Sequence, residues 1–326
     1  MIGLGIGDFR VSFADPLARS FSFSKRTNEK ASMFGFVSRW MSAPRLLLCF
    51  ALFLAGLGAF EASKTEFRAP WRDTSREPTG LAPDPAEFCE AVVQVYAAKT
   101  YGWRGIFGVH TWIAYKGDGD PRYTVAEVAR WTLARTGSAV SISHRAPDAR
   151  WFGNMPALIG DVRGEAAREA IAHIEEAIAA YPHASRYVVW PGPNSNTFVA
   201  TILAGTPQLR VDLPPTAIGK DYTERKLVGA ASSGTGWRVG YGGLAGLTVA
   251  REEGVEANLL GLVFGIDVLR PALKLPFVGR VGVAKSPGAI VEAIAGPHPD
   301  LAAATEASLA PPAGCFEAQP EKAPTV

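Results

Sequence analysis

The sequence of 326 residues predicts an α+β fold, in which an antiparallel sheet packs on helices and extra strands follow toward the C-terminus. Three observations predict this class of fold. Residues 91–116 contain two strand-like runs, residues 163–181 repeat apolar residues at helical spacing, and residues 235–283 alternate short apolar runs with glycine. Hydrophobic residues make up 48% of the chain, which is enough to form a sizeable core.

The composition excludes several classes of function. A net charge of +2, without runs of Lys and Arg between aromatic residues, argues against binding to nucleic acid. No glycine-rich phosphate motif stands between a strand and a helix, so we expect no nucleotide cofactor. Cys49, Cys89 and Cys315 have neither metal-ligand spacing nor a CxxC pattern, so we expect no metal; Cys89 and Cys315 remain candidates for a disulfide.

An uncharged apolar run lies within the N-terminal region of residues 1–63. It covers residues 46–60, with Arg39 and Arg45 before it and Glu61 after it. The run has the length of the apolar core of a secretory signal and is shorter than the roughly 20 residues of a spanning helix. We therefore expect export to the periplasm or another extracytoplasmic site. Cleavage of the signal and anchoring in the inner membrane remain alternatives, beside a buried core helix.

Changes in composition predict the domain boundaries that follow this region. Residues 64–88 are rich in proline and charge and show no period, which predicts a linker. Residues 89–285 are expected to form a single α+β domain. Residues 286–326 are rich in alanine and proline and are expected to form a tail.

The strands and the long helix of this domain follow in order. Residues 91–98 and 107–116 are rich in β-branched and aromatic side chains, and glycines between them predict an antiparallel hairpin. Residues 122–133 fit either a third strand or a short helix, and residues 138–144 are strand-like. Apolar residues recur at helical spacing over residues 163–181, which predicts an amphipathic helix.

The turn at residues 191–198 (PGPNSNTF) joins strand-like residues 187–190 to a helix-like run. It brings Ser195 to the start of a helix, where backbone N–H groups are unpaired and the dipole is positive. Such an end can hold an anion or orient a nucleophile. Asn and Ser are also favoured helix caps, so a capping role for Asn194, Ser195 or Asn196 is the alternative.

A serine nucleophile needs a neutral imidazole within hydrogen-bond reach, and that imidazole needs an orienting group. Two of the five histidines, His110 and His144, lie in predicted strands. We expect His110 to be the base for Ser195 and His144 to be the third catalytic residue, with Asp148 as a weaker candidate. The alternative for His110 is a packing role in the core. Three further residues are expected to line this site: Asn194, Asn196 and Trp112.

Several stretches resemble a bacterial family that is catalogued only as a domain of unknown function (family 3750). The resemblance covers about residues 85–285 and rests on Val95–Tyr115 (with Arg104-Gly105 and His110-Thr111-Trp112-Ile113), Trp151-Phe152-Gly153, Tyr187–Phe198 and Ile218-Gly219-Lys220-Asp221-Tyr222. That family has no established activity, so the resemblance implies no function.

A more distant resemblance concerns residues 194–198 (NSNTF). This segment is similar to the Asn-Cys-x-x-Phe element of circularly permuted papain-like proteins, the group around NlpC-type peptidases and lecithin:retinol acyltransferase. In that group a strand histidine precedes the nucleophile at a helix start, which implies a permuted papain-like core with His110 as base and Ser195 as nucleophile. Serine replaces the group's cysteine here, and a hydroxyl must lose its proton during attack.

Together these observations predict an exported cell-envelope hydrolase or acyltransferase that acts on an amide or ester. It would be a Ser-dependent amidase, peptidase or esterase without a cofactor, and its substrate would be an envelope peptide or lipid. The alternative is a non-catalytic envelope binding or structural protein with a degenerate papain-like site.

Overall fold

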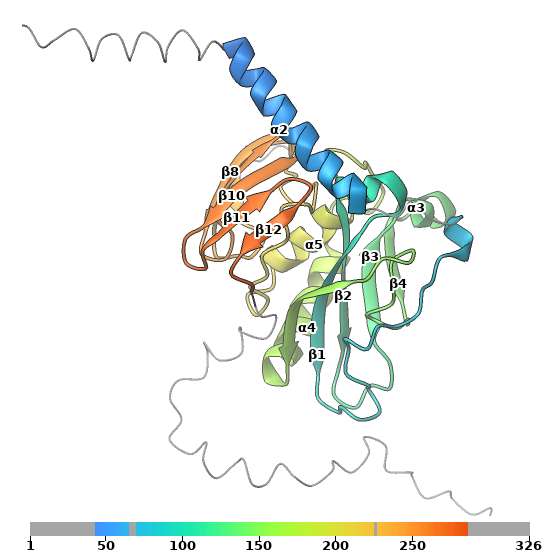
Figure 1. Cartoon of the computed structure of the whole chain (residues 1–326). Coiled ribbons are helices and arrows are strands. Elements are labelled where there is room, and N and C mark those ends of the chain that lie inside the picture. Colours follow the sequence, from blue (N-terminus) through green and yellow to red (C-terminus); the bar gives the residue numbers. More distant parts are fainter. Residues whose placement is uncertain (1–42, 65–69, 225–226, 286–326) are drawn as a thin grey trace, which may run out of the picture. The chain divides into compact units, whose positions relative to one another are not determined.

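The computed structural model of the chain describes residues 43–64, 70–224 and 227–285 (Figure 1). The chain divides into two units, residues 1–52 and residues 53–326. The fold that carries the functional residues lies in the second unit. The predicted tail of residues 286–326 lies outside the described residues.

The first described element is helix α2, Ala43–Lys64. The segment Pro44–Ser63 is long and apolar enough to cross a membrane, and it fits a membrane anchor or a signal sequence. The helix is longer than the apolar run of residues 46–60 suggests, because it continues through flanking small and polar residues at both ends.

Five antiparallel strands form the first sheet, in the order β4-β3-β2-β1-β5. The predicted hairpin is confirmed, because β1 and β2 pair from Val92–Lys116 to Lys99–Val109. The short helix η2 (Gly102–Ile106) lies between these two strands. The strands are β1 (Val92–Lys99), β2 (Val109–Lys116), β3 (Thr124–Val128), β4 (Val140–Ser143) and β5 (Ala157–Arg163).

Three local expectations need correction. Residues 122–133 contain both alternatives, since β3 is followed after Ala129 by helix α3 (Arg130–Thr136). Residues 187–190 form no strand, because the Val188 N–H donates to the Pro193 carbonyl and folds the chain back. Strand β5, which pairs with the buried strand β1, is not predicted from the sequence.

Two helices cover one face of the five-stranded sheet. They are α4 (Glu165–Ala179) and α5 (Ser195–Ala204), and their apolar side chains form one core with β1, β2 and β3. A second core lies around Trp112, on side chains of β1, β2 and β3 that alternate with those of the first core. Because successive side chains of a strand point to opposite faces, the second core lies on the face opposite α4 and α5.

Seven further antiparallel strands form a meander in the order β12-β11-β10-β9-β8-β7-β6. They are β6 (Val228–Ala230), β7 (Gly236–Tyr241), β8 (Ala245–Ala250), β9 (Gly254–Leu259), β10 (Leu262–Asp267), β11 (Ala272–Leu275) and β12 (Gly279–Gly282). Two antiparallel sheets with packed helices confirm the α+β class. The papain-like permutation stays a prediction.

Buried ion pairs attach the loop before this sheet to its inner face. Lys220, on the loop that follows α5, pairs with Glu256 of β9. Lys274 of β11 contacts Glu256 at 2.6 Å and Asp212 of the loop at 2.7 Å. All four side chains are nearly inaccessible to solvent. These pairs fix the loop that carries Ile218 and Gly219, whose carbonyls accept hydrogen bonds from Asn194 and Thr197 at the start of α5.

Candidate functional site

Helix α5 begins at Ser195, but its cap is the preceding residue, Asn194. The Asn194 Oδ1 atom accepts hydrogen bonds from the backbone N–H groups of Asn196 (3.0 Å) and Thr197 (3.2 Å). In return the Asn194 N–H donates to the Thr197 hydroxyl at 3.1 Å, which completes a capping box. The capping role therefore belongs to Asn194, and the Ser195 hydroxyl has no hydrogen bond to any described residue.

The loop at Ile218 and Gly219 holds the Asn194 amide in place. The Asn194 Nδ2 atom donates to the carbonyls of Val189 and Ile218, both at 3.0 Å. Gly219 has φ +94°, and a Cβ atom at this position would collide with the Asn194 side chain. Only glycine combines this backbone conformation with so close an approach, which explains its place in the loop.

Asn196 ties the start of α5 to strand β2. Its Nδ2 atom donates to the carbonyls of Val109 (3.0 Å) and Ile218 (2.8 Å), and its Oδ1 atom accepts from the Thr111 hydroxyl at 3.0 Å. Val109 and Thr111 flank His110 in the chain, so these bonds fix the distance between the helix start and the histidine-bearing strand.

The His110 ring is buried between a carboxylate and an aromatic ring. Its Nε2 atom lies 2.8 Å from Oε2 of Glu127 in β3, and the ring stacks on Trp151 with centroids 3.7 Å apart. Pairing of β2 with β3 stops at Ile113–Ala126, so His110 and Glu127 occupy the space beyond the last paired residues. The two contacts fix the plane of the imidazole.

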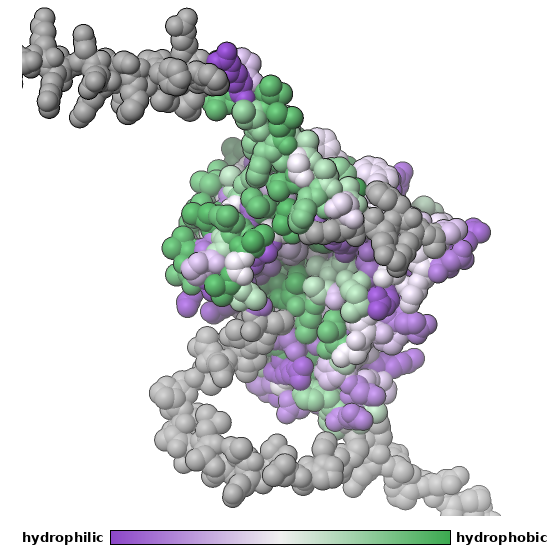
Figure 2. Space-filling model, viewed as in Figure 1, coloured by the Kyte–Doolittle hydropathy of each residue, from purple (hydrophilic) through white to green (hydrophobic). Residues whose placement is uncertain are grey.

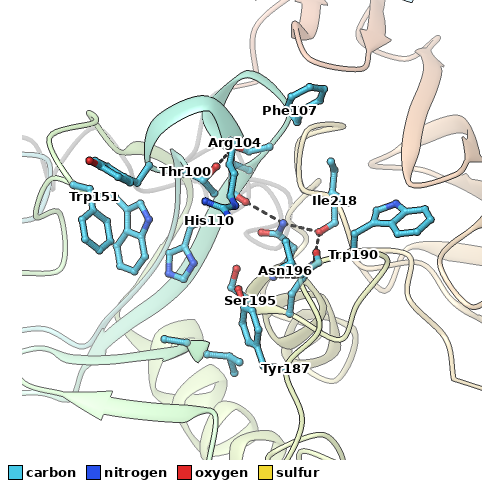
Figure 3. A pocket seen from close by; sticks show the side chains of 18 of the residues that line it. Thr100, Arg104, Phe107, His110, Trp151, Tyr187, Trp190, Ser195, Asn196 and Ile218 are labelled. Atoms are coloured by element: carbon cyan, nitrogen blue, oxygen red, sulfur yellow. Dashed lines mark hydrogen bonds between the residues drawn. The ribbon is translucent and has the colours of Figure 1, made fainter. Parts of the chain in front are cut away.

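Ser195 and His110 line the same cavity, and Figure 3 shows the hydroxyl and the imidazole on neighbouring walls of it. No hydrogen bond joins these two described side chains. With Nε2–H donated to Glu127, the lone pair of the neutral ring lies on Nδ1, which has no other described partner. This is the tautomer in which a histidine can accept a proton from a nearby hydroxyl.

Burial and neighbouring charges set the protonation of this pair. Burial lowers the pKa of His110 below its ordinary value, and Arg145 lowers it further, against the opposing effect of Glu127. Burial alone would raise the pKa of Glu127, but the hydrogen bond and charge of His110, together with Arg145, bring it below its usual range. At neutral pH the site therefore holds a neutral imidazole beside an ionised carboxylate.

His144 does not occupy the third position that the sequence predicts for it. Its Nδ1 atom lies 3.3 Å from the Tyr123 carbonyl, and it is absent from the residues that line the cavity. Glu127 takes that position instead. One sequence signal could have found Glu127, because it is an acidic residue inside an otherwise apolar strand, and buried carboxylates require a partner.

Trp112 and Asp148 also lie away from the cavity lining. Trp112 is fully buried, and its Nε1 atom donates to the Pro147 carbonyl at 2.7 Å. Asp148 accepts from the N–H groups of Thr79 and Leu81, so it holds the segment that precedes β1. Asn194, Ser195 and Asn196 line the cavity.

The cavity has a volume of about 920 Å³, which is large for a ligand pocket. Ten of its 25 lining residues are aromatic, and two are arginines, Arg76 and Arg104. The aromatic residues are Trp71, Tyr101, Trp103, Phe107, Trp131, Trp151, Phe152, Tyr187, Trp190 and Phe277. None of the described lining residues is acidic, so the cavity suits an apolar ligand with an electron-rich or anionic head.

Comparison with known proteins identifies a family but no characterised relative. Residues 90–222 match the family described as a protein of unknown function (DUF3750). No curated protein and no solved structure matches the chain. Among the described residues, no group of three or more His, Cys, Asp or Glu side chains could hold a metal ion.

Proposed function

We propose, for a chain whose residues 90–222 belong to this family of unknown function, that the cavity is an acyl-transfer site. Ser195 is the nucleophile, His110 is the general base and Glu127 orients the imidazole. The substrate is an ester or amide with an apolar acyl chain. One observation carries the proposal: Ser195 is free of any capping duty, and it shares a cavity with a neutral imidazole that a carboxylate holds in place.

The reaction follows the chemistry of a serine nucleophile. As Ser195 Oγ attacks the carbonyl carbon, its proton passes to Nδ1 of His110, and Glu127 stabilises the imidazolium that forms. The negative charge on the carbonyl oxygen faces the first turn of α5, where the Ser195 N–H has no partner within the helix. His110 then gives the proton to the leaving alcohol or amine, and water or a second alcohol takes the acyl group from Ser195.

The lining of the cavity favours a lipid over a peptide. A peptide would bring polar backbone groups into a cavity lined by ten aromatic residues. Each polar group that finds no hydrogen-bond partner there costs free energy on burial. An acyl chain carries no such cost. The Arg104 guanidinium, which stacks over Trp103 at 5.0 Å, and Arg76, which stacks over Phe152 at 4.2 Å, can bind a phosphate or carbonyl head.

Two features support an extracytoplasmic location with an inner-membrane anchor. Helix α2 is apolar enough to remain in the membrane. Cys89 is disulfide-bonded, and disulfides persist in oxidising compartments such as the periplasm. We infer that the catalytic domain lies outside the cytoplasm, close to a source of lipid.

The second candidate is a lipid-binding protein without turnover. The lack of a hydrogen bond between Ser195 and His110 favours it, although catalytic contacts in unliganded enzymes often tighten only with substrate. Both candidate functions predict an apolar lipid ligand, and they differ only in whether the Ser195 hydroxyl reacts with it. A covalent probe of the hydroxyl therefore separates them.

The test uses the full-length chain in detergent with fluorophosphonates that carry short or long alkyl chains. Attack by Ser195 forms an O–P bond and expels fluoride, and the hydroxyl proton passes to His110. We expect mass spectrometry to place the adduct on Ser195, with much faster labelling by the long-chain probe. Binding of a long-chain fatty acid without an adduct at any chain length would support the lipid-binding protein instead.

The pH dependence of turnover should report the burial of His110. Because its pKa lies below the ordinary value of about 6.5, kcat/KM should stay constant through neutral pH and fall only in more acidic solution. Glu127→Gln removes a group that raises this pKa, so the acidic limb should move to still lower pH. The rate should also fall by about 10²–10⁴-fold, as for other orienting carboxylates.

His144→Ala is the matched control for this profile, because His144 is a strand-end histidine outside the cavity. It should leave both the acidic limb and the rate unchanged. An acidic limb above pH 6.5, or a limb that Glu127→Gln does not move, would show that another group is the base.

A further inference from the structure

The seven-stranded sheet exposes apolar side chains to solvent and turns polar side chains inward, which is the reverse of the usual arrangement. All nine exposed positions of β7, β8 and β9 carry apolar or aromatic side chains, among them Trp237, Val239, Tyr241, Leu247, Val249 and Leu259. The inward positions of these strands hold small residues and polar or charged groups instead, including Glu256 and Asn258, and β11 adds Lys274. Figure 2 shows the resulting hydrophobic surface over this sheet. So large an apolar face on a folded protein marks an interaction surface.

Exposed tryptophans line the cavity. Five of the seven described tryptophans are more than half exposed, and four of these line the cavity: Trp71, Trp103, Trp131 and Trp190. We call these four residues the tryptophan rim. Tryptophan is usually largely buried in soluble proteins, but it is enriched where proteins meet the headgroup region of a bilayer.

The two surfaces are continuous. Leu260, in the turn between β9 and β10, is exposed beside Leu259 of the sheet face and also lines the cavity. Its carbonyl accepts a hydrogen bond from Trp190 Nε1 at 2.9 Å, which joins the sheet to the tryptophan rim.

We propose that the outer face of the seven-stranded sheet and the tryptophan rim dock on a lipid bilayer. The chain supplies a tether, because α2 can span a membrane and only residues 65–69 separate it from the next described segment. Five residues reach at most roughly 20 Å. In addition, Lys99 donates to Glu61 in the last turn of α2 at 2.8 Å, next to Thr100 in the cavity wall.

A lipid bilayer explains the apolar exposed side chains of this sheet better than a second copy of the chain does. The exposed positions of β7, β8 and β9 offer no charge or hydrogen-bonding side chain apart from the ring ends of Trp237 and Tyr241. These two residue types are the ones that favour the membrane interface. Docking would bring the cavity mouth to the lipid headgroups, so that an acyl chain could enter without crossing water.

The experiment places a fluorescent label on the sheet face of the full-length chain in vesicles of phosphatidylethanolamine and phosphatidylglycerol. The label is attached at Leu247→Cys, with Cys49→Ser to remove the free cysteine among the described residues. Ile142→Cys is the matched control, because Ile142 lies on β4 of the other sheet and is 49% exposed, like Leu247. Val239→Cys provides a second position if the first variant folds poorly.

We expect nitroxide-labelled lipid to quench the label at 247 or 239 several-fold more than the label at 142, and aqueous iodide to do the reverse. Equal quenching by iodide at both sites would show that the face lies in water. Protection from both quenchers would show that protein covers the face, and disulfide cross-linking through position 247 would identify that protein as a second copy. Either result would overturn the proposal.

Discussion

Replacement of Ser195 by alanine is expected to lower turnover of a long-chain ester by at least about 10³-fold and to leave the thermal midpoint unchanged. Turnover falls because the attacking oxygen is removed. Stability is retained because the Ser195 hydroxyl makes no hydrogen bond to a described residue and Asn194 caps the helix. Ester hydrolysis and a thermal scan of the same preparation check both halves of this expectation.

Asn194→Ala is the matched comparison at the adjacent position. Loss of a helix cap costs about 1–2 kcal/mol. This variant also removes the donor to the Val189 carbonyl and one of the two donors to the Ile218 carbonyl, which keeps its hydrogen bond from Asn196. We expect a clear fall in the free energy of unfolding. If Ser195→Ala destabilised the protein as much as Asn194→Ala, or kept full turnover, the assignment of roles to these two residues would be wrong.

The second large effect is expected from Lys274→Met. Lys274 is completely buried and pairs with both Asp212 and Glu256. Its removal takes one cation from each of two buried carboxylates, although Glu256 keeps Lys220 and Asp212 keeps Lys285. Leaving a buried charge without any partner costs about 3–5 kcal/mol, so we expect a loss near the lower end of this range. Urea unfolding of the full-length chain in detergent measures the loss.

Arg186→Met is the control for this substitution. Arg186 and Glu224 form an exposed ion pair at 3.4 Å, and such pairs contribute about 1 kcal/mol or less. The loss caused by Lys274→Met should also shrink as pH falls, because a buried carboxylate that has lost one cationic partner has a higher pKa and takes up a proton more readily in the folded state. A loss as small as that of Arg186→Met would mean that the network has little influence on stability.

Elements with a strong local pattern could be predicted from the sequence. The helix of residues 163–181 and the hairpin of residues 91–116 appear with small shifts in their ends, because apolar periodicity and strand-forming side chains agreed there. The prediction of a strand at residues 187–190 is wrong. Their β-branched and aromatic content fits a strand, but the hydrogen bond from Val188 to Pro193 closes a loop instead.

The candidate site could be predicted only in part. The sequence indicates His110 and Ser195, because each lies in a segment with its own recognisable pattern. Glu127 could not be assigned as their partner, since its approach to His110 depends on the register between β2 and β3 and on the point where their pairing stops. The residues that line the cavity come from segments between residues 71 and 277. No local sequence pattern predicts that aromatic side chains so far apart in the chain lie together in the fold.

The capping box has a consequence for how this protein can change over time. Since Asn194 and Thr197 secure the start of α5 between them, the side chain at position 195 carries no structural duty that the described contacts reveal. A thiol, a hydroxyl or a bare methyl group could occupy this point on the same scaffold. Position 195 determines the reactivity of the site, and Asn194 and Thr197 maintain its structure. Evolution or protein design can therefore change the residue at 195 without disturbing the fold.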